Sequence, residues 1–476
     1  MTLITEHLTG RASPVHDPAE VGPDDGARIA EYTKWRAFAR GEQWPQAAKP
    51  SERRLTFNYA RALVRKTASY VFPGPVTFSI ETPDKTADQS AGNANERILA
   101  GVVEALDLNA LDLELEIERA ICGDAAVKVT WDKTAGRPRV VSVDPATLAA
   151  TWSPDDPRTP HAISQTYQLP GWALLPYGID VAGDKQLHTV TEHWTAETWT
   201  MTIAGTDYAH AQPNPYGWIP YAIIPNDPHP RQFWGRSDLT DLLDVCRELN
   251  REMSVLATIM ELSGAPVAVL ENVDSSIGIT TRPGARWELP ADSRAYLLDL
   301  LAGQGVRLHV DYIDQLRTTL HDLSETPRTA FGDSGRPLSG AALEVEVQPL
   351  LQKVARKRHG WNRFHRERNR MILDLIDTFG TETVAADRTT TTNWPPVLPS
   401  DDEVVARTQV QLVAANIRSR QTAMATLGDP DPQGELERVK AELKALQALT
   451  QPAEDAPDDG NRSKESSATE NAATTP

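Results

Sequence analysis

The chain has 476 residues and a formal net charge of −18, which is enough length for two to four structural modules with a sizeable core. This acidic balance excludes a general nucleic-acid coat, which needs basic residues to neutralise phosphates, but not a protein that DNA passes without sticking. Two cysteines are too few for a disulfide framework, and the sequence shows neither a signal peptide nor an apolar run of about 18 residues, which predicts a soluble cytosolic chain.

The N-terminal part is predicted to be a module of helices and strands, of the α+β class. Residues 1–24 are polar and contain prolines, which predicts an unpaired arm. Patterns with periods of 3.6 and 2 then predict four helices and a β-rich stretch that ends near residue 230. The helices cover 25–44, 58–72, 94–106 and 109–121, and the strands cover 76–80, 126–131, 139–143, 162–168, 187–194 and 198–203.

A long amphipathic helix is predicted over residues 233–263. Gly235 and Ser237 open it with capping chemistry, and Gly264-Ala265-Pro266 stops it. Its apolar residues follow a heptad seam of Leu239, Leu242, Cys246, Leu249, Met253, Leu256 and Met260. Taken alone, this seam favours a long core helix of a globular domain.

The C-terminal half is predicted to be mainly helical. A short insert with three strands (267–270, 287–289 and 296–298) precedes a helix over 306–323 and a polar loop over 326–340. A long helix over 341–379 follows, and Lys357 and Arg368 interrupt its apolar seam. The remaining predictions are a strand over 389–397, helices over 401–427 and 432–449, and a disordered tail from residue 451.

Several motifs, in this order and at this spacing, resemble the portal proteins of tailed bacteriophages, in particular the SPP1-like portal family. The resemblance covers about residues 30 to 380. Its motifs are Phe38-Ala39-Arg40-Gly41-Glu42-Gln43-Trp44, Asn58-Tyr59 through Phe72-Pro73-Gly74-Pro75, Gly123, Val143-Asp144-Pro145, Ile224-Pro225-Asn226, Gly235-Arg236-Ser237-Asp238-Leu239, Leu249-Asn250 and Leu338-Ser339-Gly340-Ala341-Ala342-Leu343.

The resemblance implies a portal fold with named parts. These are an N-terminal arm (1–24), an α+β wing (25–232), a stem helix (233–264), a small β-containing clip (265–303), a second stem helix (304–325), a tunnel loop (326–340), a long wing helix with a return strand (341–400), a helical crown (401–450) and a disordered tail (451–476). It also implies a homo-oligomeric ring, usually a dodecamer, at one capsid vertex of the virion, assembled in the host bacterial cytoplasm. The expected partners are double-stranded DNA in the channel, the terminase large subunit, a head-tail connector or adaptor, and the major capsid and scaffolding proteins.

No catalytic residue, metal site or cofactor is predicted. Gly332-Asp333-Ser334-Gly335 looks like the nucleophile loop of trypsin-like proteases, but no matching histidine motif precedes it, and a polar turn explains the same residues. No phosphate-binding GxxxxGK[ST] loop occurs, so a motor partner would have to hydrolyse ATP. The alternatives that remain are a soluble enzyme with a helical oligomerisation arm and a different phage head-tail connector protein.

Three groups of residues are candidates for function in such a channel. The acidic channel wall comprises Asp238, Asp241, Asp244, Glu248 and Glu252, which sit at helical spacing on one predicted face. The basic helix, for contacts between subunits or for attracting DNA, comprises Lys353, Arg356, Lys357, Arg363, Arg366 and Arg370. The tunnel loop offers Arg328, Ser334 and Arg336 as DNA-facing residues. For the first two groups, the alternative is a solvated or internally paired helix face.

Overall fold

The computed structural model describes residues 23–47, 52–80, 89–153, 156–177, 186–203, 205–264, 268–271, 293–297, 305–333, 340–398, 402–429 and 432–450. The chain divides into two compact units, Met1–Val397 and Leu398–Pro476. The mixture of helices and strands confirms the predicted α+β class. The arm before residue 23, the strand predicted over 287–289 and the tail from residue 451 lie outside the described residues.

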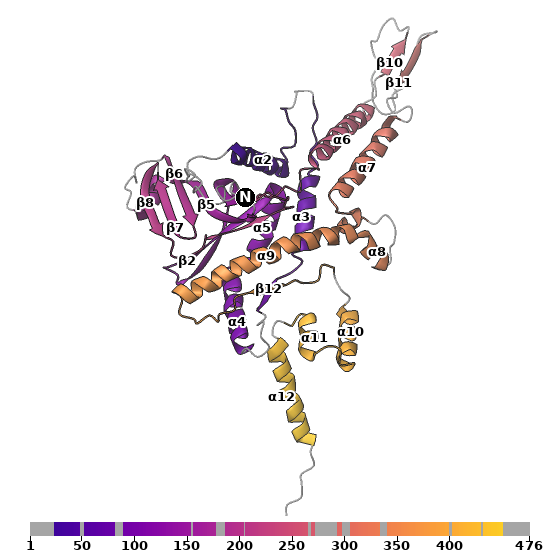
Figure 1. Cartoon of the computed structure of the whole chain (residues 1–476). Coiled ribbons are helices and arrows are strands. Elements are labelled where there is room, and N and C mark those ends of the chain that lie inside the picture. Colours follow the sequence, from indigo (N-terminus) through magenta and orange to yellow (C-terminus); the bar gives the residue numbers. More distant parts are fainter. Residues whose placement is uncertain are drawn as a thin grey trace, which may run out of the picture. The chain divides into compact units, whose positions relative to one another are not determined.

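The first unit begins with helices that cover one of two antiparallel sheets (Figure 1). The sheet of order β3-β2-β9 packs against the helices, and the sheet of order β4-β5-β6-β7-β8 packs against that first sheet. The helices are α2 (Pro23–Arg40), α3 (Tyr59–Val71), α4 (Gln89–Ala105) and α5 (Leu108–Cys122). The strands are β2 (Asp124–Asp132), β3 (Arg137–Val143), β4 (Leu148–Ser153), β5 (Asp156–Pro170), β6 (Leu187–Thr195), β7 (Thr198–Ile203), β8 (Thr206–Pro213) and β9 (Tyr221–Pro225).

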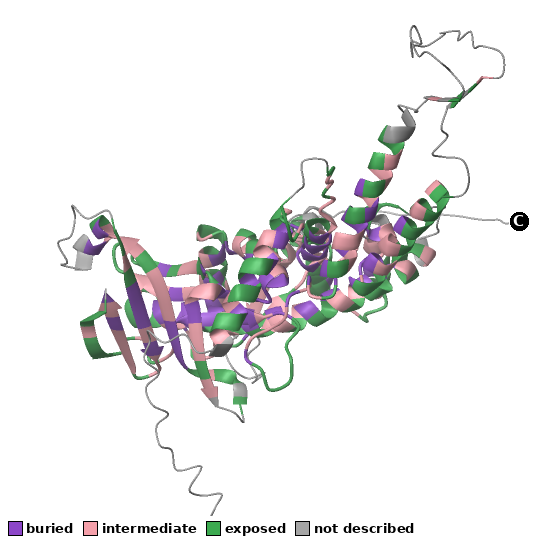
Figure 2. Ribbon diagram, turned by 90° about the horizontal axis from the view of Figure 1, so that it is seen from above, coloured by how far each residue is buried: buried purple, intermediate pink, exposed green. Residues whose placement is uncertain are grey.

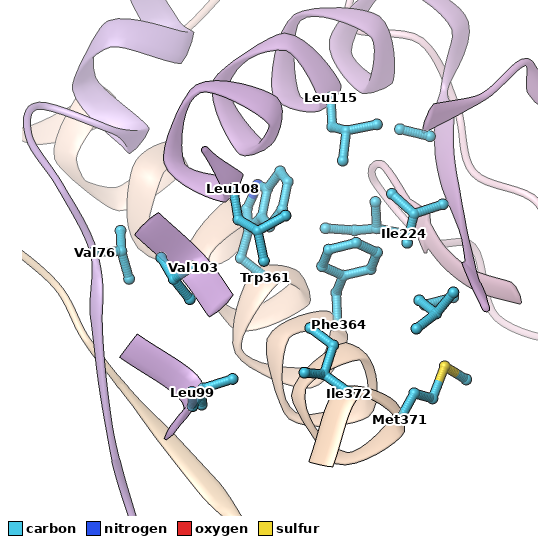
Figure 3. Close-up of a cluster of buried hydrophobic side chains, with 14 of the residues drawn as sticks. Val76, Leu99, Val103, Leu108, Leu115, Ile224, Trp361, Phe364, Met371 and Ile372 are labelled. Atoms are coloured by element: carbon cyan, nitrogen blue, oxygen red, sulfur yellow. The ribbon is translucent and has the colours of Figure 1, made fainter. Parts of the chain in front are cut away.

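The main core forms where α9 (Gln348–Phe379) crosses this module. Trp361 and Phe364 of α9 pack edge to face and meet Leu108, Leu115 and Ile224 from α5 and β9 (Figure 3). The strand β12 (Thr390–Asn393) then returns and pairs with β1 (Thr77–Ile80). The helix α9 therefore ties the C-terminal end of the first unit to its N-terminal helices.

Two helices, α6 (Leu243–Gly264) and α7 (Gly305–Leu323), run side by side away from the two sheets (Figure 1). Between them in the chain, β10 (Ala268–Glu271) pairs with β11 (Arg294–Leu297), with Val269 opposite Tyr296. The buried side chains of α6 lie mainly in its first half, and its far half is more exposed (Figure 2).

Two predicted helices have wrong boundaries, for identifiable reasons. The helix expected from residue 233 begins at Leu243, because the preceding segment docks on α5, where Asp238 N–H donates to the Ala120 carbonyl at 2.9 Å. The helix expected over 341–379 is α8 (Gly340–Glu346) followed by α9, since Pro349 lacks the N–H that would continue the ladder.

The second unit, described by itself, contains α10 (Asp402–Ala414), α11 (Arg420–Thr426) and α12 (Pro432–Thr450). The single helix expected over 401–427 is therefore wrong. Asn416 takes a left-handed conformation (φ 56°), and the Ser419 side chain caps the new helix by accepting from Thr422 N–H at 3.1 Å. No helix among the described residues is long and apolar enough to cross a membrane.

Candidate functional site

The helix pair α6 and α7 is held together by apolar and polar contacts. Ile313 and Leu320 of α7 are buried in one cluster with Leu249 of α6. Farther along the pair, Glu252 of α6 lies 2.9 Å from Nδ1 of His309 of α7, and its side chain is only 9% exposed. The two helices therefore form one projecting unit. Three sets of contacts fix the direction of this helix pair where it joins the rest of the first unit. We call this junction its base.

The first anchor of this base is a relay of three side-chain amides. Asn250 of α6 donates to Oε1 of Gln43 at 2.6 Å, and Nε2 of Gln43 donates to Oδ1 of Asn58 at 3.0 Å. Asn58 in turn caps α3 by accepting from Arg61 N–H. Gly41, with φ at +107°, makes the turn that brings Gln43 inward. The relay joins three separate sequence motifs and links α6 to the ends of α2 and α3.

The second anchor is a close backbone junction. Asn226 N–H donates to the Gly123 carbonyl, and Arg236 N–H donates to the Asn226 carbonyl, each at 2.7 Å. A Cβ atom on Gly235 would lie 2.2 Å from the Asn226 carbonyl oxygen. Only glycine fits at this position, where the segment before α6 passes between the end of α5 and the end of β9.

The third anchor is a buried charge cluster around Lys357 of α9. Its Nζ lies 3.0 Å from Oε1 of Glu116 and 3.1 Å from Oδ2 of Asp238, and it donates to Oδ1 of Asn226 at 2.6 Å. Glu116 also accepts from Trp361 and Arg119. This cluster joins α5, α9 and the segment leading into α6 through one ammonium group.

The charges around Lys357 set the ionisation of both carboxyl groups. Burial would raise the pKa of Glu116, but Lys357 and Arg119 outweigh it and hold that pKa below its ordinary value. Burial acts likewise on Asp238, where Lys353 and Lys357 hold the pKa far below its ordinary value. Both groups are therefore carboxylates at neutral pH, and the cluster is an ion network.

A second ion network lies farther along α9. Asp112 of α5 pairs with Arg368 and lies 3.0 Å from Nε2 of His365, and all three side chains are almost fully buried. Burial lowers the pKa of His365, so the imidazole is neutral at pH 7 and Arg368 balances the Asp112 charge. The cations that interrupt the apolar seam of this helix are thus core residues with carboxylate partners on α5.

The predicted acidic face is only partly present. Asp238 is paired within the Lys357 cluster with its side chain 10% exposed, and Glu252 is buried against His309, so neither belongs to an exposed wall. Asp241, Asp244 and Glu248 are the accessible members. Both carboxylate oxygens of Asp241 accept hydrogen bonds from Arg236, and Glu248 pairs with Arg251 at 2.5 Å. The exposed face consequently alternates acids with arginines.

The predicted basic helix divides in the same way. Lys353 and Lys357 are nearly buried and paired with Asp238, so they are not available to an outside partner. The others are exposed: Arg356 pairs with Glu325, Arg370 with Asp374, Arg363 donates to the Arg158 carbonyl, and Arg366 faces solvent. Most of this positive charge is compensated within the chain.

The predicted tunnel loop begins as folded structure. Residues Arg328–Phe331 form a 3-10 helix, Ala330 is buried in the main core, and Arg328 pairs with Asp333 at 2.7 Å. Ser334 and Arg336 lie outside the described residues. Among the described residues, no group of three His, Cys, Asp or Glu side chains could hold a metal ion.

Sequence reasoning missed the residues that form the base itself. Gln43, Asn58, Asn226 and Asn250 were recognised as parts of motifs, but nothing local to each motif indicated that they meet. A polar residue inside an apolar seam, such as Asn250 beside Leu249, was the available signal, since buried amides need partners.

Asp124 adds a pH-dependent contact to this base. It accepts from Tyr32 O–H at 2.5 Å and Gly235 N–H at 2.9 Å, and burial raises its pKa to about 6. A raised folded-state pKa contributes stability that is complete below about pH 4 and is lost as pH rises through 6. We therefore expect Asp124→Asn to gain about 2–3 kcal/mol relative to the wild type between pH 4 and pH 7.5, in urea-unfolding experiments.

The exposed Asp227→Asn variant is the matched control and should keep the wild-type pH profile. If the Asp124→Asn and wild-type profiles ran parallel across this pH range, the assigned ionisation of Asp124 would be wrong.

Comparison with known families gives one match over most of the chain. The model described as "Phage portal protein, SPP1 Gp6-like" matches residues 32–301 and 306–448. The search of curated proteins finds no match. The matched ranges contain every residue of the three anchors.

Proposed function

Because the chain belongs to the family of phage portal proteins like SPP1 Gp6, we propose that it forms a ring at one capsid vertex, through which double-stranded DNA is packaged and ejected. The family is structural, so the proposed mechanism is geometric and has no catalytic step. Neighbouring copies bury surface against each other, and closed cyclic symmetry leaves an axial channel. A dodecamer is the proposed ring, in the virion, after assembly in the host bacterial cytoplasm.

The observation that carries this proposal is the projecting helix pair with its rigid base. A channel wall under load needs helices whose direction is fixed, and buried polar networks fix direction because each member has one satisfied geometry. The amide relay, the junction at Gly235 and the Lys357 cluster hold α6 and the segment before it to five elements, α2, α3, α5, β9 and α9. A soluble enzyme with a helical arm would not need this anchorage, and the family match disfavours it and the head-tail connector alike.

Electron microscopy of the purified protein tests the ring most directly. We expect end-on rings with a central hole, at high protein concentration or with scaffolding protein present. A compact dimer at every concentration would contradict the proposal.

Within the ring, we propose that α6 and α7 are the stem and that residues 265–303 are the clip. The clip would dock the terminase large subunit and later the head-tail connector, while residues 401–450 would be the crown inside the head, near capsid and scaffolding proteins. Deleting residues 265–303 should leave the unfolding of the wing unchanged and abolish terminase binding in a pull-down assay. Terminase binding by the deleted ring would place the docking site elsewhere.

We further propose that Asp241, Asp244 and Glu248 line the channel and that Asp241 and Glu248 occupy Arg236 and Arg251, so that these cations do not hold phosphates. Changing Asp241, Asp244 and Glu248 to Asn, Asn and Gln would free Arg236 and leave Arg251 with Glu252 as its remaining carboxylate, at 3.1 Å. We expect intact rings but several-fold less DNA packaged per head, measured by nuclease protection. Unchanged packaging would exclude this role. Arg328, with Ser334 and Arg336, remains the proposed DNA-facing set of the tunnel loop.

A further inference from the structure

A basic face that the sequence analysis did not single out lies on α3. Arg61 and Arg65 are exposed one helical turn apart, and Lys66 beside them lies 5.3 Å from the ring centroid of Phe331. Among the described residues, no carboxylate pairs with any of the three. Like charges at this spacing destabilise a helix slightly, so the face costs the isolated chain stability. We call Arg61, Arg65 and Lys66 the α3 basic face.

A complementary acidic face lies on α7. Asp311, Asp314 and Asp322 follow one stripe at steps of three and eight residues and are exposed. Within the described part of the chain, the ion-pair partners of Asp311 and Asp314 are distant: Arg307 and Arg317, each at 3.8 Å. The stripe extends over about 16 Å of the helix, and the α3 basic face over about 8 Å, so two or three pairs can form between them. We call these three residues the α7 acidic face.

The two faces cannot satisfy each other within one copy in the arrangement observed. The helices α3 and α7 both direct apolar side chains into one buried cluster, Leu63 and Val64 from α3 and Ile313 and Leu320 from α7. The charged residues lie on the opposite sides of these helices, away from that cluster. Each copy therefore presents two different complementary surfaces, as a head-to-tail contact between identical subunits requires.

We propose that the α3 basic face of one copy binds the α7 acidic face of the next copy in the ring. The inference rests on the proposed ring and names the residues that join its subunits. Copies with a net charge of −18 repel one another, and uncompensated cations at the contact offset this repulsion locally. The alternative ligand, DNA phosphate, suits this face less well, because cations that hold phosphates would arrest a moving duplex.

Charge reversal in the full-length protein tests the contact. Arg61→Glu with Arg65→Glu, or Asp311→Arg with Asp314→Arg, should each raise the concentration at which rings form at least tenfold. Combining all four changes should return it to within threefold of the wild type. The control, Lys133→Glu with Arg137→Glu, makes the same charge change on the exposed β2–β3 turn and should assemble normally. Normal assembly of either reversal, or no recovery on combination, would overturn the contact. Loss of DNA binding with normal assembly would assign the face to DNA.

Cross-linking separates this inference from the ring itself. Chains carrying Arg65→Cys and chains carrying Asp314→Cys are mixed and treated with a short bismaleimide, since the native Cys122 and Cys246 are buried. We expect a cross-linked dimer in the mixture and none in either variant alone. Rings without this product would refute the contact and leave the proposed function standing. The product without closed rings would support the contact and refute the ring.

Discussion

Replacing Lys357 with methionine should lower the free energy of unfolding by about 3–5 kcal/mol at pH 7, because it leaves two buried carboxylates without their shared cation. Glu116 and Asp238 both lie within 3.1 Å of the Lys357 ammonium. The Glu116 side chain is fully buried, and the Asp238 side chain is 10% exposed. Methionine fills much of the same volume, so the expected loss is electrostatic. Chemical unfolding followed by circular dichroism measures it.

The stability that Lys357→Met loses should depend on pH, because the loss comes from the charges of two carboxylates. The depressed pKa values of Glu116 and Asp238 contribute stability that is present above their unfolded-state values and is lost as pH falls through the folded ones. Without Lys357 both values rise, so the deficit of the variant should shrink as pH is lowered toward 4. A deficit independent of pH would show that packing, and not charge, is the cause.

Two further variants test whether the charge imbalance causes the lower free energy of unfolding of Lys357→Met. Arg356→Met removes a cation one residue earlier on the same helix, where the side chain is 58% exposed, and should cost about 1 kcal/mol or less. Adding Asp238→Asn to Lys357→Met removes one of the two carboxylates that lost Lys357, keeps Glu116 paired with the buried Arg119, and should restore part of the lost stability. Failure of this restoration would contradict the ion-network assignment.

The sequence predicts the types of most elements correctly because their apolar periods are local properties. The strand β7 agrees with its predicted bounds, and α3 and α5 agree to within a residue or two. The strands β4, β8 and β9 were missed. In β8 nearly every side chain is exposed, so no alternation marks it.

The candidate site was harder to predict because its contacts join distant parts of the chain. In a single sequence, Lys357 and Arg368 look like interruptions of a seam, since their partners Glu116 and Asp112 are more than 240 positions away. Asp112 and Glu116 lie one turn apart on α5, whereas the two cations lie about three turns apart on α9, so the spacing along one helix does not reveal the pairing. Likewise, Ser237 and Asp238 look like a helix start, although both are held by α5.

The junction before α6 yields the second large effect: Gly235→Ala should destabilise the protein by roughly 4 kcal/mol or more. The added Cβ would lie 2.2 Å and 2.4 Å from the carbonyl oxygen and the amide nitrogen of Asn226, and 2.4 Å from the Gly123 carbonyl oxygen. All three are backbone atoms, so no side-chain rotation relieves the overlap. The segments must separate, which breaks the two 2.7 Å hydrogen bonds of the junction.

Gly101→Ala in α4 is the control, because a Cβ there meets nothing within 4 Å and alanine favours the helix by about 1 kcal/mol. Urea midpoints of the two variants should therefore move in opposite directions. Because Gly235 N–H also donates to Asp124 and Arg236 N–H to Asn226, separation at the junction would release the segment that leads into α6. If the Gly235→Ala variant remains soluble, we expect it to stop forming rings before the core of the proposed wing unfolds. Assembly should then be lost at urea concentrations where the far-ultraviolet signal is still native. A variant with the wild-type midpoint and normal rings would mean that the base does not fix the direction of the helix pair.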